Sequence, residues 1–176
     1  MNRFVAFGIL VLAFSASFQL GSMYEHTEEG AQDLVQQFME TVRGIDGIGI
    51  FWHNLSLALP MFIPGFGMAW GLFAGWSTGF TLSALTTTNP ELGGIQPLAL
   101  LYLSPFGIME LAAYSLAASR SLLLALRIYR KQALRPQLKP TLIEVGIVCG
   151  LLLAGGLVEY HIIELAGGWP DPSEPT

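Results

Sequence analysis

Residues 67–85 read GMAWGLFAGWSTGFTLSAL, and glycine recurs at every fourth position of this stretch. The spacing places four residues on one stripe of an α-helix, namely Gly67, Gly71, Gly75 and Gly79. In water each interior glycine costs a helix about 0.5–1 kcal/mol relative to alanine. In a bilayer the backbone has no alternative hydrogen-bonding partner, and small residues let two helices approach closely. The stretch therefore predicts a tightly packed membrane helix, whose glycines face a helix of the same chain or of a second copy.

The composition also indicates a membrane protein. Hydrophobic residues make up 52% of the 176 residues, charged residues only 12%, and the mean hydropathy is +0.54. A typical soluble domain carries about 25% charged residues. We therefore expect a single transmembrane domain over residues 1–176. The only cysteine, Cys149, excludes an intramolecular disulfide and zinc sites built on paired cysteines. The net charge of −5 and the lack of a large basic patch argue against a nucleic-acid partner.

The apolar segments predict an all-α membrane protein, a five-span helical bundle. Pro64-Gly65 separates the second span from the third, which predicts a tight, glycine-rich hairpin. Ser104-Pro105 interrupts the fourth span, which predicts a helix that is broken near residue 105. The five expected spans cover residues 4–21, 48–63, 67–85, 98–126 and 141–163.

The segment between the first two spans is polar and acidic. Within it, apolar residues recur at helical spacing over residues 31–42, from Leu34 to Val42. This pattern predicts a short amphipathic helix that lies on the bundle or at the membrane interface, outside the cell.

The distribution of basic residues predicts the orientation. Arg3 and the cluster over residues 127–139 should be cytoplasmic. The cluster is most simply a determinant of topology, and the alternative is that it also attracts anionic lipid headgroups. Five crossings then place the N-terminus in the cytoplasm and the C-terminus outside a multi-pass protein of the cell membrane. We expect Arg120 to reach toward the interface, and Glu144 to contact the basic loop or water.

Three polar residues within the apolar segments are candidates for a functional core: Asn54, Glu110 and Glu159. Glu110 follows Pro105 and Gly107, two residues expected to shape the helix packing, by about one turn. An intramembrane carboxylate costs at least about 2.5–3.5 kcal/mol and should face protein or water. Glu110 could relay protons, bind a cation or contact a partner, or it could tie helices together as a neutral, hydrogen-bonded group. We hypothesise that Asn54 and Glu110 meet in the core of the bundle.

No motif predicts catalysis. The sequence lacks a phosphate-binding loop, and no Ser/His/Asp or Cys/His arrangement stands outside the apolar segments. Glu159 and His161 are two residues apart and do not share a helix face, so their spacing does not suit a metal ion. We therefore expect no enzyme activity, no catalytic residues, no metal and no cofactor.

The middle of the chain resembles the stage II sporulation protein M family, small polytopic membrane proteins of bacteria and archaea. The resemblance covers about residues 48–159 and rests on residues 51–54 (FWHN), the glycine-rich stretch 64–79 and residues 104–110 (SPFGIME). Glu159 is similar to a recurrent glutamate of the family. Phe106 stands where the family usually has a histidine, so a His–Glu pair at this point is not available here.

The resemblance implies a role as a non-enzymatic scaffold or assembly subunit. The partners would be membrane lipids and other membrane or cell-envelope proteins, or a second copy of the chain. The apolar face of residues 31–42 and the glycine stripe would then be partner or self-association surfaces. The alternative is a small homo-oligomeric transporter or channel with an intramembrane carboxylate at Glu110.

Overall fold

The computed structural model describes residues 2–89, 94 and 96–167, and every regular element within them is helical. Part of the expected polar loop 86–97 and the acidic tail 168–176 lie outside the described residues. The long helices are α1 (Arg3–Ser22), α2 (Glu28–Val42), α3 (Gly47–Ala58), α4 (Phe66–Thr88), α6 (Pro105–Tyr129) and α7 (Leu138–Leu165), and the short elements are η1 (Leu59–Phe62), α5 (Pro97–Leu103) and η3 (Arg135–Gln137).

Side-chain caps define where three of these helices begin. The Thr27 hydroxyl accepts a hydrogen bond from the Gly30 N–H at 3.2 Å, so the amphipathic helix α2 starts before the predicted residue 31. The Asp46 carboxylate accepts from the Gly49 N–H at 2.7 Å at the start of α3. Ser104 separates α5 from α6, which is the predicted break near residue 105, and its hydroxyl accepts from the Gly107 N–H at 3.1 Å.

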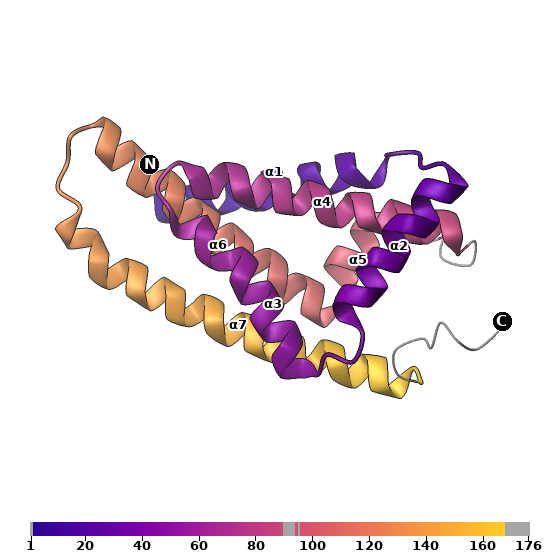
Figure 1. Ribbon diagram of the computed structural model, residues 1–176. Helices are drawn as coiled ribbons and strands as arrows, with labels where there is room; N and C mark the ends of the chain where they lie inside the picture. Colours follow the sequence, from indigo (N-terminus) through magenta and orange to yellow (C-terminus); the bar gives the residue numbers. More distant parts are fainter. Residues whose placement is uncertain (1, 90–93, 95, 168–176) are drawn as a thin grey trace.

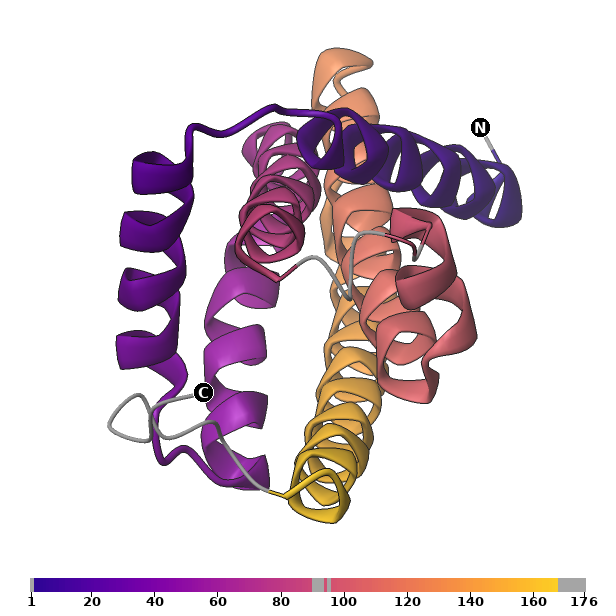
Figure 2. The ribbon, with the colours of Figure 1, turned by 90° about the vertical axis from the view of Figure 1, so that its right-hand side faces the viewer.

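The long helices pack against one another in pairs (Figure 1). α1 lies along α4 in the most extensive contact of the fold, and α7 contacts both α6 and α3. α2 packs on α4 and stands at one side of the molecule when the view is turned by 90° (Figure 2). The side chains of Met61, Val148 and Leu152 are fully buried in the core between these elements.

The two arms of the predicted hairpin pack chiefly on other helices and not on each other. α3 and α4 diverge from their shared turn (Figure 1), and α3 packs chiefly on α7 whereas α4 packs chiefly on α1. The turn itself is tight, because Gly65 adopts a φ of +81°, a conformation that favours glycine. The glycine-rich segment therefore joins two packing partners instead of forming one antiparallel pair.

Three helices of the described chain are long and apolar enough to cross a membrane: α1, α6 and α7, the last counted together with η3. α4 has 23 residues but is not among the helices that meet this criterion of length and hydropathy. α3 has only 12 residues, about 18 Å of helix, and the hydrocarbon core of a bilayer is about 30 Å thick. The chain is thus an all-helical protein with three clear candidate spans.

Candidate functional site

A cavity of about 580 Å³ opens between α2, α3, α4, α6 and α7. All three predicted core residues line it, Asn54 from α3, Glu110 from α6 and Glu159 from α7. Most of the remaining wall is apolar or aromatic, with hydroxyl groups contributed by α4. The other lining residues are Phe38, Val42, Ile45, Ile50, His53, Leu57, Trp70, Phe73, Ala74, Ser77, Thr78, Thr81, Phe106, Tyr114 and Ile163.

Asn54 and Glu110 meet at the wall of this cavity. The side chain of Asn54 is buried, and its Nδ2 donates a hydrogen bond of 2.7 Å to Oε1 of Glu110. The bond joins α3 to α6 over 56 residues of sequence, as the hypothesis required. One amide donor satisfies only part of a carboxylate's capacity to accept hydrogen bonds, so Glu110 keeps acceptor sites for another group.

The corner between α5 and α6 positions Glu110. Ser104 accepts from the Gly107 N–H and donates to the Leu100 carbonyl oxygen at 2.6 Å, while Pro105 occupies the first turn of α6. A Cβ atom at Gly107 would collide with Ser104 and with the α5 backbone at Leu101. The corner therefore requires glycine at this position, and it sets the direction in which α6 carries Glu110 into the bundle.

Tyr114 and Phe106 complete the cavity wall on α6. Tyr114 follows Glu110 by four residues, so both lie on one face of the helix. Its ring is buried and lies 5.8 Å from that of Phe14, centroid to centroid. Phe106 presents an apolar ring to the cavity at the position where the resemblance leads one to expect a histidine.

The glycine stripe packs inside the chain. A Cβ atom at Gly67 would overlap the Met61 carbonyl, and one at Gly79 would overlap the Phe18 carbonyl of α1. Gly75 also faces α1, where a Cβ would lie 3.2 Å from the Phe14 carbonyl oxygen, and Gly71 faces Ala118 of α6. Each of the four glycines therefore meets a neighbour within the chain.

The apolar face of α2 is also turned toward the bundle. Val42 is buried, Leu34 is half-buried, and Phe38 lines the cavity. The opposite face exposes acidic and amide side chains, among them Asp33 and Glu40.

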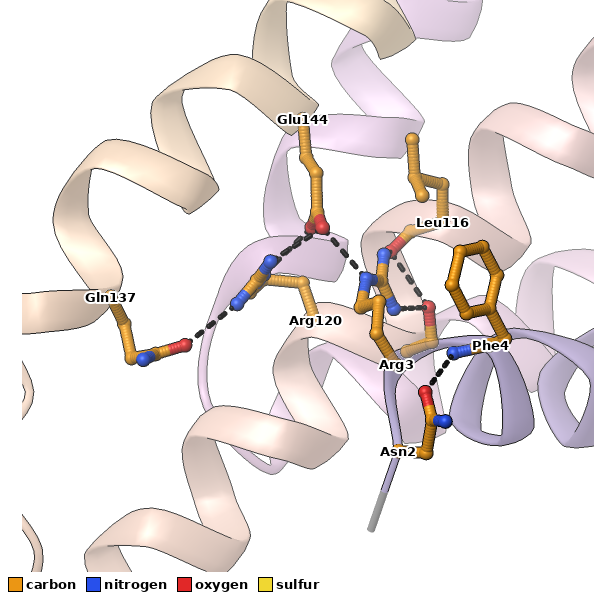
Figure 3. A network of polar contacts seen from close by, with 8 residues as sticks. Asn2, Arg3, Phe4, Leu116, Arg120, Gln137 and Glu144 are labelled. Atoms are coloured by element: carbon orange, nitrogen blue, oxygen red, sulfur yellow. Dashed lines mark hydrogen bonds and ion pairs between the residues drawn. The ribbon is translucent and has the colours of Figure 1, made fainter.

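The sequence interpretation missed a second polar cluster, an ion network at the far end of the bundle (Figure 3). Arg3 donates from Nε to Glu144 at 2.6 Å, and Arg120 pairs with both carboxylate oxygens of Glu144. Arg3 further donates to the Ser119 hydroxyl and Arg120 to Gln137 at 3.0 Å. The network ties α1, α6 and α7 together.

The structure differs from two expectations about this end of the bundle. Arg120 is only 4% exposed and is turned into the bundle, and Glu144 is 8% exposed and pairs with Arg3 and Arg120 instead of the basic loop. The sequence contained a signal for this network, since oppositely charged residues within apolar helices are expected to pair with one another.

Among the described residues, no group of three or more His, Cys, Asp or Glu side chains could hold a metal ion. The cavity residues can instead offer hydrogen-bond acceptors and negative charge to a ligand that brings donors or positive charge of its own.

The chain matches a known protein family. The family model described as "Stage II sporulation protein M" matches residues 3–162, nearly the whole chain. The matched region includes α1 and α2, so it extends well beyond the expected residues 48–159 toward the N-terminus. Neither the curated proteins nor the solved structures contain a match.

Proposed function

Because the chain belongs to the stage II sporulation protein M family, we propose that it is a non-enzymatic integral membrane protein, and that its cavity binds a small cationic solute as part of a transporter or channel. The observation that carries this proposal is that Asn54, Glu110 and Glu159, from three different helices, line one cavity.

The chemistry of the cavity favours a positively charged ligand. Two carboxyl groups that share an apolar cavity repel each other when both are ionised, and burial makes each charge costly. A cation or a shared proton relieves both penalties. The hydrogen bond from Asn54 holds the Glu110 carboxylate in place, while Tyr114 adds a hydroxyl group on the same wall.

The proposed topology gives the cavity an external mouth. We take α1, α3 with η1, α4, α6 and α7 as five crossings, with the N-terminus in the cytoplasm. The end where α2 joins α3 then lies outside, and Val42, Ile45 and Ile163 at that end line the cavity. A solute would enter from outside and reach Glu110 within the bundle.

The arrangement of α2 and α4 lowers the support for the scaffold interpretation. The glycine stripe of α4 contacts other helices of the same chain, and the apolar face of α2 covers the cavity. Neither surface is free for a partner. Replacing Leu34, Phe38 and Val42 by polar residues would disturb internal packing and would not test partner binding.

The assembly-subunit role remains a second candidate, and one observation favours it. The outward face of α2 exposes Glu29, Asp33 and Glu40, an acidic surface suited to a basic partner outside the membrane. Native mass spectrometry of the protein in nanodiscs made from its own membranes is the corresponding experiment. A hetero-complex that the wild type forms, and that is lost when Asp33→Asn and Glu40→Gln are combined, would favour this role over the transporter.

The transporter proposal predicts that Glu110→Gln lowers cation flux. The substitution keeps the size of the side chain and removes its charge, so the flux of potassium or protons into proteoliposomes should fall about 10-fold or more, the equivalent of about 1.4 kcal/mol of lost cation stabilisation. Dye-reported flux in liposomes containing the purified protein measures this.

Glu164→Gln is the matched control, because Glu164 is an exposed carboxylate on α7 that does not line the cavity. Its flux should equal that of the wild type. Flux that Glu110→Gln leaves unchanged, or wild-type flux no greater than that of empty liposomes, would refute the proposal.

A further inference from the structure

A second cavity of about 620 Å³ lies at the end of the bundle opposite the junction of α2 and α3. Its walls come from the start of α1, the end of α6, the start of α7 and the loop between α6 and α7. Four arginines line it, Arg3, Arg120, Arg127 and Arg130, together with a single carboxylate, Glu144. Its charged side chains therefore carry a net charge of +3.

The charged side chains at the floor of this cavity are bound to one another. Glu144 accepts hydrogen bonds from both Arg3 and Arg120, and further N–H groups of these arginines bind Ser119, Gln137 and the Leu116 carbonyl oxygen. These contacts join the buried Arg120 and the half-buried Arg3 to Glu144, as Figure 3 shows.

The two arginines at the rim of the cavity, Arg127 and Arg130, differ from those at the floor in their contacts. Arg127 is half-buried and Arg130 is exposed, and neither side chain makes a hydrogen bond or ion pair with any residue that the structure describes. Arg127 lies in the last turn of α6 and Arg130, three residues later, is the C-cap residue of the helix, and both line the cavity. Gln132 lines the cavity beside them and adds an amide donor.

We propose that this cavity binds a phosphate group, presented by an anionic phospholipid headgroup or by a soluble phosphate. Arg127 and Arg130 contact the phosphate oxygens, and the guanidinium fork of arginine suits such contacts. The Arg3–Glu144–Arg120 floor supplies further positive potential beneath them. The surroundings suit an anionic membrane surface, since seven of the eight basic residues of the chain belong to this end, all except Arg43.

The test compares two pairs of substitutions that remove the same charge. Arg127→Gln with Arg130→Gln removes the rim of the cavity, whereas Arg135→Gln with Lys139→Gln removes two charges from the same loop region that do not line it. The full chain is placed in nanodiscs of phosphatidylcholine alone. Calorimetric titration then uses short-chain phosphatidylglycerol, short-chain phosphatidylcholine and inorganic phosphate as separate probes.

Phosphatidylglycerol is expected to bind the wild type, and the rim pair should weaken its binding about 30-fold, since each basic residue near a lipid phosphate contributes roughly 1 kcal/mol. The control pair should change the affinity less than about 3-fold, because its residues lie outside the cavity. Inorganic phosphate that binds as tightly as the lipid, with the same loss in the rim pair, would support the site and assign it to a soluble phosphate.

Equal weakening by both pairs would overturn the proposal, because it would indicate only diffuse attraction to negative charge. Binding of neither anionic probe, or equal binding of phosphatidylcholine, would also overturn it. The melting temperature of the rim variant in phosphatidylcholine nanodiscs should match that of the wild type, since its side chains hold no partner in the described fold.

Discussion

Replacing Glu144 by glutamine is expected to lower the free energy of unfolding by about 3–5 kcal/mol. Among the residues that the structure describes, this carboxylate is the only negatively charged partner of Arg3 and Arg120, and the Arg120 side chain is only 4% exposed. Its loss leaves two positive charges facing each other where water cannot solvate them fully. Unfolding followed by helical circular dichroism in a denaturing-detergent titration measures the change.

Two comparisons show whether the lost charge is the cause. Glu164→Gln makes the same change on the same helix at an exposed position, and it should alter stability by less than about 0.5 kcal/mol. Replacing Arg3, Arg120 and Glu144 together by methionine removes every charge of the network, and this variant should be more stable than Glu144→Gln. A Glu144→Gln protein as stable as Glu164→Gln would contradict the buried network.

Gly79→Ala is the substitution with the second large expected effect, a loss of about 2–3 kcal/mol. A Cβ atom at this position would overlap the Phe18 carbonyl oxygen, and the nearby atoms belong to the backbone of α1, which cannot turn away as a side chain can. The two helices would have to separate along their contact, the most extensive one in the fold. The same detergent titration reports the loss.

Gly150→Ala serves as the matched control. Gly150 lies in the middle of α7, and a Cβ atom there would meet nothing within 4 Å. Because alanine is the better helix former, this variant should be neutral or more stable by up to about 1 kcal/mol. Equal destabilisation by both substitutions would contradict the prediction, because it would show that the close α1–α4 approach at Gly79 does not distinguish the two positions.

Much of the helical framework could be predicted from local patterns. Apolar runs marked the helices, the Ser104-Pro105 dipeptide marked the break between α5 and α6, and helical spacing marked the amphipathic α2. The fold does not confirm all five predicted spans, because α3 is short and α4 is rich in small and hydroxyl residues. Length and mean hydropathy alone single out three helices.

The polar residues of the candidate site could be predicted from the sequence, but most of the side chains that surround them could not. Polar residues in apolar helices are costly, so Asn54, Glu110 and Glu159 stood out before any contact was known. That Tyr114, Phe38 and the hydroxyl side chains of α4 share their cavity followed from no local pattern. Those residues are distant in the sequence, and only the packing of five helices brings them together.

The sequence by itself determined that the chain forms apolar helices, which faces of them are small or polar, and that charged groups within them need partners. The tertiary structure decided that Gly75 and Gly79 face α1, that the apolar face of α2 covers a cavity, and that Glu144 joins Arg3 to Arg120. The physical reason is that lipid and protein interior are equally apolar. Hydrophobicity therefore cannot select a helix's neighbour, and close packing together with the pairing of buried charges makes that choice.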